Sequence, residues 1–295
     1  MKPTLRSFAV ALAIAVPYLA SAATPVDPKS PLPGYPDGKG PTGPVSITIK
    51  TPKQDEVFPI PPAEPGKPAP KGARVVLEVE VKNFETWKDP KSGQGQHLQM
   101  VLDGRYQFPY RQVDKPWVFP ALPKGTHTIR LFAQRPWHES IKEKDAFAAV
   151  TFHVGEKDPT KPLFDPSQPT ITANVPRGKI KKSEAAKILF DFFVTGCTVG
   201  PITDPEACQV VYRLDAEPQK TLTAWEPVWW ENVPVGRHAY VIALYKGEKR
   251  IEAPYALDQE GFEVVDDGPA APAGPAGETN GTAPTTPTPP PANVK

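Results

Sequence analysis

Five histidines are the side chains of this 295-residue chain best suited to hold a metal ion, because imidazole is a common ligand for copper and zinc. They are His97, His127, His138, His153 and His238. The stretch around His127, "PKGTH", returns around His238 as "PVGRH", whereas Gln209 and Glu263 stand where His97 and His153 would recur. A histidine that recurs in the second copy without the other possible metal ligands is better explained by a structural role. We therefore predict structural roles for His127 and His238 and no metal site, with weak binding by His97 and Gln99, or by His138 and Glu139, as the alternative.

Ser140 beside His138 and Glu139 has the residue types of a hydrolytic relay. Neighbours on an extended chain face opposite ways, so these three cannot form the hydrogen bonds that such a relay requires. The sequence also contains no Gly-x-Ser-x-Gly, no His-Glu-x-x-His and no glycine-rich phosphate loop. We predict that the protein is not an enzyme and needs no cofactor; a hydrolytic or metal-binding enzyme is the least favoured alternative.

The two cysteines, Cys197 and Cys208, lie close together in the sequence. A metal site built on two thiolates would need further ligands at matching spacing, and none stands nearby. An exported chain meets oxidising conditions, under which such a pair predicts one disulfide. The bond would close a short loop and aid one domain without providing its framework.

Aromatic residues gather in "TAWEPVWWENVP", and exposed tryptophans can serve as platforms for sugar rings. Successive side chains of a strand point to opposite sides, so Trp230 is assigned to the core while Trp225 and Trp229 share the other side. These two rings are the alternative carbohydrate platform. In the other interpretation, large aromatic side chains cover the end of a domain or seal the boundary between two domains.

The elements that carry these residues form two related blocks. "ARVVLEVEVKNF" matches "AAKILFDFFVTG", and in both the apolar residues alternate with a period of two, which predicts strands. The phrase "ALPKGTHTIRLFAQ" likewise matches "ENVPVGRHAYVIALYK", where Gly125 and Gly236 turn the chain into a strand. Strand parity places His97 and His153 outward, away from the face that holds His127. Each block has the length and the short strands of a β-sandwich, so the predicted fold is all-β, with two tandem immunoglobulin-like domains.

The shared Pro-x-Gly-x-His motif resembles the start of a late strand in immunoglobulin-like and fibronectin-type-III-like domains of exported bacterial proteins. "RPWHES", at residues 135–140, is similar to an element that recurs in uncharacterised domains of that kind. The resemblance covers most of residues 45–266. It implies the fold and brings no catalytic residues with it.

Loops at the ends of a sandwich vary freely because the sheets carry the stability, so residues specific to one copy are candidates for binding. "RPWHES" occurs in the first block alone, at the exit of its most regular strand. We predict that Trp137, His138 and Glu139 engage a macromolecular partner. In the other interpretation Trp137 packs over the end of the domain.

The first residues, "MKPTLRSFAVALAIAVPYLASAA", have the basic start, apolar run and small residues of a signal peptide cleaved near Ala22. This predicts an exported protein, periplasmic or released, without stable membrane insertion. The net charge of +1 and the lack of a basic stripe disfavour nucleic acid as a partner. We expect a binding or scaffold protein of the cell envelope whose partner is an envelope or extracellular protein or polysaccharide.

The 41 prolines cluster after the signal peptide, in a loop of the first block at 59–72 and in the tail, and predict extended or disordered segments there. The expected organisation is a signal peptide at 1–22, a proline-rich linker at 23–44, domains at 45–156 and 169–267 joined by a linker at 157–168, and a disordered tail rich in Pro, Ala and Thr at 268–295.

Overall fold

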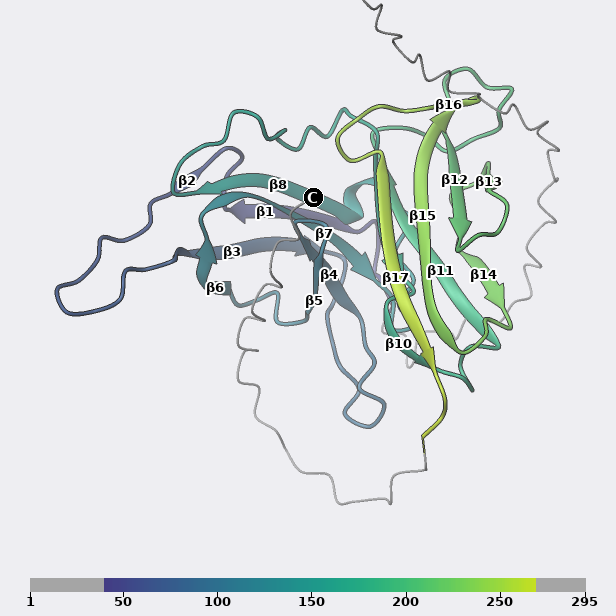
Figure 1. The fold of residues 1–295 in the computed structure, drawn as a ribbon, viewed down its shortest axis with the longest axis horizontal. Helices are drawn as coiled ribbons and strands as arrows, with labels where there is room; N and C mark the ends of the chain where they lie inside the picture. The colour runs from purple at the N-terminus through teal and green to yellow at the C-terminus, as the bar shows by residue number, and fades with distance from the viewer. Residues whose placement is uncertain (1–39, 269–295) are drawn as a thin grey trace, which may run out of the picture.

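The computed structural model describes residues 40–268, which form two β-sandwich domains in tandem (Figure 1). The predicted signal peptide, most of the proline-rich segment before residue 45, and the tail from residue 269 lie outside the described residues. In Figure 1 the long strands β3 and β8 of the first domain run across the view, whereas β15 and β17 of the second run down it. The strands of the two domains therefore cross at a steep angle.

The first domain pairs a sheet in the order β1-β3-β6 with a larger sheet in the order β2-β8-β7-β4-β5. The proline-rich loop at residues 59–71 projects between β2 and β3 (Figure 1). The strands are β1 (Ser46–Thr51), β2 (Val57–Phe58), β3 (Gly72–Lys82), β4 (His97–Leu102), β5 (Tyr106–Tyr110), β6 (Trp117–Pro123), β7 (Gly125–Gln134) and β8 (Phe147–Val154), with a short 3-10 helix η2 (Lys144–Ala146).

The second domain repeats this arrangement with sheets β9-β11-β14 and β10-β17-β15-β12-β13, and the short β16 also pairs with β15. Its strands are β9 (Thr170–Val175), β10 (Gly178–Lys181), β11 (Lys187–Thr195), β12 (Gln209–Leu214), β13 (Lys220–Leu222), β14 (Val228–Glu231), β15 (Gly236–Lys246), β16 (Lys249–Arg250) and β17 (Leu257–Val265).

In each domain the chain changes from one sheet to the other after its first strand. β1 runs antiparallel to β3, and after the cis bond Thr51–Pro52 the chain continues as β2, parallel to the last strand β8. β9 and β10 do the same around the cis bond Val175–Pro176, with β17 as the last strand. Because both domains share this strand order, the predicted pair of immunoglobulin-like or fibronectin-III-like sandwiches is confirmed.

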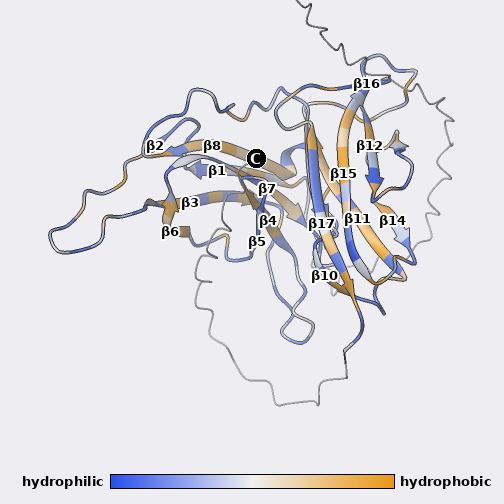
Figure 2. Ribbon diagram, viewed as in Figure 1, coloured by the Kyte–Doolittle hydropathy of each residue, from blue (hydrophilic) through white to orange (hydrophobic). Residues whose placement is uncertain are grey.

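Each domain has its own core, built from the alternating apolar residues of its strands. Hydrophobic residues concentrate on the strands and hydrophilic ones on the loops (Figure 2). Val75 and Leu77 of β3 and Phe190 and Phe192 of β11 are all 0% exposed, as their period of two predicts. Trp230 stacks on Phe190 with ring centroids 4.5 Å apart, so it belongs to the core of the second domain.

The outer face of the larger sheet of the first domain packs against the outer face of the smaller sheet of the second. Phe193 of β11 contacts Phe132 of β7 and Phe147 of β8, with ring centroids 5.6 and 5.2 Å apart. Val101 of β4 is buried in the same cluster. Both faces of β4 and β7 are therefore covered, and every residue of β4 is buried. We call this contact the interdomain joint.

His97 and His153 lie on the outer face of their sheet, opposite the face that holds His127, as parity predicts, but that face is covered and not solvated. They are 1% and 2% exposed. His97 Nδ1 lies 2.7 Å from the carbonyl oxygen of Gly95, and His153 Nε2 lies 2.9 Å from an Asp55 carboxylate oxygen. Parity indicates which side chains share a face, but it does not tell what covers that face.

The segment predicted as a linker, residues 157–168, also contributes to the joint. Phe164 is 6% exposed and contacts Phe147 of the first domain and Tyr255 of the second, with centroids 5.9 and 6.1 Å apart. Its backbone N–H donates to Thr151 Oγ1 at 2.8 Å, and its carbonyl accepts from the Gln54 amide at 2.8 Å. The segment that connects the domains is therefore anchored to both of them through Phe164.

Gly125→Val and Gly236→Val should each lower the free energy of unfolding by more than about 1 kcal/mol. The two glycines have φ of +153° and +143°, a region that β-branched side chains avoid. Thermal melting of each variant measures the effect. Gly268, where an added Cβ meets nothing within 4 Å and φ is not positive, provides the control Gly268→Val. Wild-type melting of both test variants would contradict the assigned turns.

Candidate functional site at the interdomain joint

A buried carboxylate of the second domain holds the end of the "RPWHES" segment in place. Asp191 of β11 is 0% exposed. Its Oδ2 accepts from the backbone N–H of Ser140 at 3.0 Å and from the Asn174 amide at 2.6 Å, and its Oδ1 forms an ion pair with Lys142. Two domains thus meet at one carboxylate whose hydrogen-bonding capacity is used on both oxygens.

The turn before Ser140 is fixed from both domains as well. The carbonyl oxygen of His138 accepts from the Gln134 amide of β7 at 2.8 Å and from the Asn174 amide of β9 at 2.7 Å. Gln134 also donates to the Asn174 side-chain oxygen at 2.8 Å. These bonds hold His138 at φ +69°, an unusual backbone conformation for a residue with a side chain.

Trp137 and Glu139, two of the residues predicted to bind a partner, contact each other. The indole N–H of Trp137 donates to Glu139 Oε2 at 2.7 Å, and Arg135 Nε lies 3.6 Å from the same oxygen. The Arg135 guanidinium lies 5.7 Å from the centre of the Trp137 ring. Glu139 is buried, whereas Trp137 is half-buried. Glu139 therefore holds the orientation of the Trp137 ring from a buried position and is not itself at the surface.

His138, the third predicted residue, is exposed. Its ring meets the His97 ring edge to face, with centroids 5.9 Å apart. Burial lowers the pKa of His97 to about 4, and the positive charges of Arg111 and His138 add to this shift. Partial burial of the His138 ring also lowers its pKa, and the positive charge of Arg111 adds to this effect. Both rings are therefore neutral at pH 7.

The residues considered for weak metal binding have other contacts in the structure. Glu139 faces Trp137 and Arg135 while His138 faces His97, and Gln99, which lies next to His97, donates to Gln107 at 3.0 Å. Among residues 40–268, no three His, Cys, Asp or Glu side chains gather into a group that could hold a metal ion. Ser140 is 0% exposed and contacts Asp191, Lys142 and the Phe192 carbonyl, so it does not meet the His138 ring.

Trp225 of the second domain lies at the same joint. Its indole N–H donates to the Phe192 carbonyl at 3.2 Å, and its ring meets Phe193 at right angles, 4.9 Å between centroids. Ser140 and Lys142 donate to the same carbonyl at 3.4 and 2.9 Å. The structure therefore connects the "RPWHES" segment with one of the two tryptophans of the alternative platform, through a single backbone oxygen.

Trp229, the other tryptophan of that platform, lies in β14 opposite Leu189 of β11. It is half-buried, and the Lys187 ammonium lies 4.9 Å from its ring centre. Trp225 seals the joint, whereas Trp229 lies beside a lysine on the same sheet. The two rings thus have different surroundings.

His127 and His238, predicted to be structural, make the same set of contacts in both domains. Nδ1 of each lies 2.8 Å from a carboxylate oxygen, of Asp103 or Asp215, and Nε2 lies 2.9 Å from the carbonyl of Pro123 or Pro234. Each carboxylate also accepts the backbone N–H of the residue that follows the histidine: Thr128 at 2.9 Å in the first domain and Ala239 at 2.8 Å in the second. Because both ring nitrogens face oxygen acceptors, this geometry favours the imidazolium form, which has two N–H donors.

The pKa values of these two histidines follow from this geometry. Burial acts to lower the pKa of His127, but the hydrogen bond and charge of Asp103, with the Pro123 carbonyl, outweigh it and raise the pKa above its ordinary value. In the second domain, Asp215 and the Pro234 carbonyl likewise outweigh burial and raise the pKa of His238. The Pro-x-Gly-x-His motif thus ends in an imidazole whose charged form is favoured by its surroundings in both domains.

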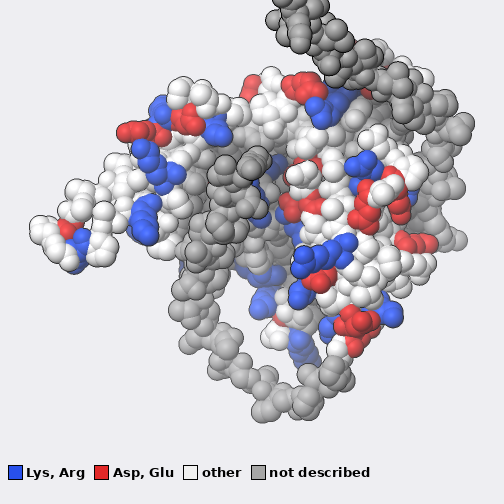
Figure 3. All heavy atoms as spheres, in the orientation of Figure 1, with Lys and Arg blue, Asp and Glu red and all other residues white. Residues whose placement is uncertain are grey.

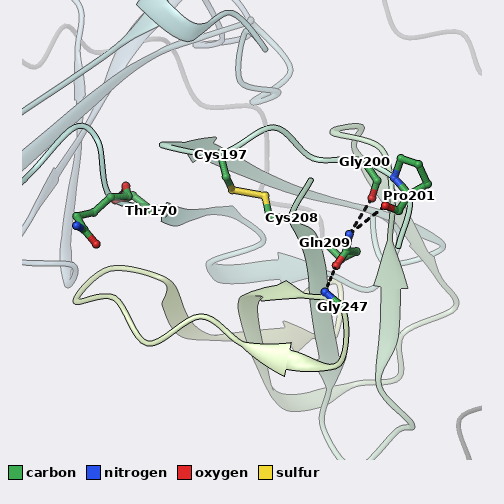
Figure 4. The surroundings of a disulfide bond; sticks show 8 residues. Thr170, Cys197, Gly200, Pro201, Cys208, Gln209 and Gly247 are labelled. Atoms are coloured by element: carbon green, nitrogen blue, oxygen red, sulfur yellow. Dashed lines mark hydrogen bonds between the residues drawn. A yellow bond between two sulfur atoms is a disulfide. The ribbon is translucent and has the colours of Figure 1, made fainter. Parts of the chain in front are cut away.

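The predicted disulfide joins Cys197 and Cys208, whose Cα atoms are 6.1 Å apart (Figure 4). Next to it, the Gln209 side chain donates to the Gly200 and Pro201 carbonyls at 3.2 and 3.3 Å and accepts from the Gly247 N–H at 2.9 Å. The bond and the glutamine attach the loop after β11 to β12 and to the turn after β15. This cluster stabilises one end of the second domain.

Sequence reasoning missed the polar residues that join the two domains: Gln134, Lys142, Asn174 and Asp191. One signal was present in the sequence. Asp191 interrupts the apolar run "KILFDFFVT", where an unpaired carboxylate would be costly to bury, so its presence there indicates a buried partner. Nothing in the sequence identified that partner as Lys142.

Two further observations bear on the possible partners. On the face drawn in Figure 3, acidic and basic side chains are interspersed over the second domain. Within the described part of the chain, no helix is both long enough and apolar enough to cross a bilayer.

No protein-family model matches the chain, and no curated protein matches it. Solved structures with a similar strand arrangement include the fibronectin(III)-like modules of Clostridium thermocellum CbhA, at 12% identity and a TM-score of 0.24, over 75% of this chain and 94% of that one. The BSP domain of a biofilm associated protein has 12% identity and a TM-score of 0.24, over 77% and 30% of the two chains. Bacteroides ovatus SGBP-B of the mixed-linkage glucan utilization locus, solved with a mixed-linkage heptasaccharide, has 11% identity and a TM-score of 0.21, over 75% and 47%.

The chain thus spans less than half of the last two proteins. At these identities and TM-scores the likenesses carry no argument about function. The assignment to immunoglobulin-like and fibronectin-III-like sandwiches rests on the strand order described above.

Proposed function

We propose that the protein is an exported, non-enzymatic binding or scaffold protein that engages an envelope or extracellular macromolecule, a protein or a polysaccharide, at the interdomain joint. The binding residues are Trp137 and His138, with Glu139 orienting the tryptophan. The disulfide and the signal-peptide pattern support export. The mixed surface charge disfavours nucleic acid as the partner.

One observation carries this proposal: the His138 carbonyl accepts hydrogen bonds from amides of both domains, while the residue itself lies exposed at the surface. The backbone of the turn is thereby fixed, and the ring is presented in one place. A surface loop that is held rigidly loses little conformational entropy when it binds. Binding therefore gains from this arrangement, whereas a turn that only connected two strands would not need it.

We expect the double variant Trp137→Ala/His138→Ala to recover at least tenfold less partner from envelope extract than the wild-type chain does. Circular dichroism and thermal melting must first show that the fold is kept, because Trp137 also contacts Glu139. Trp229→Ala serves as the matched control, since it removes a half-buried tryptophan away from the turn. Full recovery of every partner by the folded double variant would contradict the proposal.

The same comparison tests the alternative in which Trp225 and Trp229 hold a polysaccharide. If Trp229→Ala loses binding to a panel of immobilised polysaccharides while the double variant retains it, the carbohydrate platform of the second domain is the binding site. Trp225 is less suitable as the sole probe, because its indole takes part in the joint.

A further inference from the structure

A polar pocket of about 500 Å³ opens between the two domains, on residues that the proposed binding turn does not include. Its walls come from the β4–β5 turn and β7 of the first domain, from the connecting segment, and from the start of β17 in the second. Its volume lies within the range of small-molecule sites, which often form at domain boundaries. The pocket is therefore large enough for more than an inorganic ion.

The floor of the pocket holds a guanidinium group that no carboxylate neutralises directly. Arg130 is 4% exposed and lines the pocket. Its Nη1 donates to Thr172 Oγ1 at 2.9 Å and to the Ile171 carbonyl at 3.3 Å, and its Nε has no hydrogen-bond partner. Among the ion pairs of residues 40–268, none includes Arg130. A buried charge without an ion partner is costly, so the site favours a negative charge nearby.

The acids of the pocket are engaged elsewhere. Asp103 accepts from His127 and from the backbone of Thr128, and Asp258 accepts the backbone N–H of Ala173 at 3.0 Å. Asp258 acts on Arg130 through space only, where it opposes the effect of burial, which lowers the pKa of the arginine. The negative charge already present therefore does not satisfy the guanidinium.

Two further cations stand at the rim. Arg105 and Lys161 line the pocket, are exposed, and take part in no ion pair within the described chain. Hydroxyl groups line it as well: the Tyr255 hydroxyl contacts Thr128 Oγ1 at 3.1 Å, and Thr126 lies beside them. Leu257, 41% exposed, adds apolar surface. Cations, hydroxyls and an apolar side chain together suit a polyhydroxylated anion.

We propose that this pocket binds an acidic sugar, a ligand of about one sugar ring that carries a carboxylate or a sulfate ester. Arg105 and Lys161 meet the oxyanion at the rim, and Arg130 supplies positive charge from the floor. The hydroxyls of Thr126, Thr128 and Tyr255 meet the hydroxyls of the sugar. This site is separate from Trp137 and His138 and does not depend on the proposed function.

Isothermal titration calorimetry of the full chain at constant ionic strength tests the site with D-glucuronate, glucose 6-sulfate, inorganic sulfate and D-glucose. We expect at least one acidic sugar to bind at least tenfold more tightly than glucose and inorganic sulfate. Arg105→Gln/Lys161→Gln should weaken that binding at least tenfold. Lys67→Gln/Lys71→Gln, which removes two positive charges from the remote proline-rich loop, should not change it. Arg130→Met, once melting shows a folded protein, should abolish the binding.

Comparison of the two acidic sugars then shows which oxyanion the site takes. Equal affinity for glucose and the acidic sugars, no saturable heat with any of them, or unchanged binding in Arg105→Gln/Lys161→Gln would each overturn the proposal. So would inorganic sulfate binding as tightly as the sugars, because it would leave no role for the ring. Trp137→Ala/His138→Ala should bind the acidic sugar normally, which keeps the failure of either proposal distinct from the failure of the other.

Discussion

Replacing Asp191 by Ala is expected to lower the free energy of unfolding by about 3–5 kcal/mol, because it removes one partner of a buried ion pair and leaves the other uncompensated. Asp191 is 0% exposed, and the side chain of Lys142 is 17% exposed. The substitution also leaves the Ser140 N–H and an Asn174 amide hydrogen without their acceptor. Urea denaturation followed by circular dichroism measures the loss.

Asp266→Ala provides the matched control for this prediction. Asp266 lies 3.9 Å from Lys182, but the two side chains are 77% and 65% exposed, so the control should change stability by less than about 1 kcal/mol. The double variant Asp191→Leu/Lys142→Met should recover part of the loss, since it leaves no charge unpaired. If Asp191→Ala unfolds like the control, the joint does not hold the two domains together as described.

Asp103→Asn should cost about 1.5–3 kcal/mol at pH 6, because it removes a charge-assisted hydrogen bond to His127. Asparagine tolerates the left-handed backbone of this residue, at φ +54°, so the loss reports on the charge. Asp215→Asn, its counterpart, should cost less, since the Asp215 side chain is 41% exposed and that of Asp103 is 30%. Chemical denaturation of both variants decides the order.

The pH dependence of stability gives this prediction a second measurement. The pKa of His127 is raised in the folded chain above the unfolded value of about 6.5, so its contribution is complete below about pH 6.5. The contribution is lost as the pH rises through the folded-state pKa. The wild-type chain should therefore lose stability between pH 6.5 and 9, and Asp103→Asn should lose less over the same interval.

A change in stability above pH 6.5 can also be assigned to His127 rather than to the histidines at the joint, His97 and His138. Because the pKa of His97 falls to about 4 and that of His138 is lowered too, their contributions are present above about pH 6.5 and are lost as the pH falls below it. A wild-type stability that is flat from pH 6.5 to 9, or a variant with the same slope as the wild type, would show that the imidazoles are not held in the charged form.

Much of each single domain could be predicted from the sequence. The alternation in β3 and β11 identifies the inward residues, and Asp103-Gly104, with both φ angles positive, forms the hairpin that its turn signal indicates. Repetition of the Pro-x-Gly-x-His motif indicated that two copies of one architecture were present. These signals depend only on residues close together in the sequence, so they can be interpreted without knowing the tertiary arrangement.

The interdomain joint could not be predicted, because its polar residues look like surface residues. Thr172, Asn174 and Gln134 alternate with apolar neighbours as they would on a solvated face, yet all are at most 1% exposed. Interfaces between domains are about as polar as the rest of the surface, so composition does not distinguish them. Consequently nothing in the sequence indicated that Ser140 of the first domain and Trp225 of the second both donate to the Phe192 carbonyl.

The joint connects unlike faces of two similar units, the larger sheet of the first domain and the smaller sheet of the second. Such a head-to-tail contact does not close on itself, and a series of copies could grow from it into a filament. In the first domain, Glu80 of β3 stands where the second has Phe193, and it pairs with Lys50 and Lys82 at the surface. A third unit would have to strip water from these charges. The charged residues at this position of the first domain therefore disfavour the addition of a further unit, whether a third domain or a second molecule.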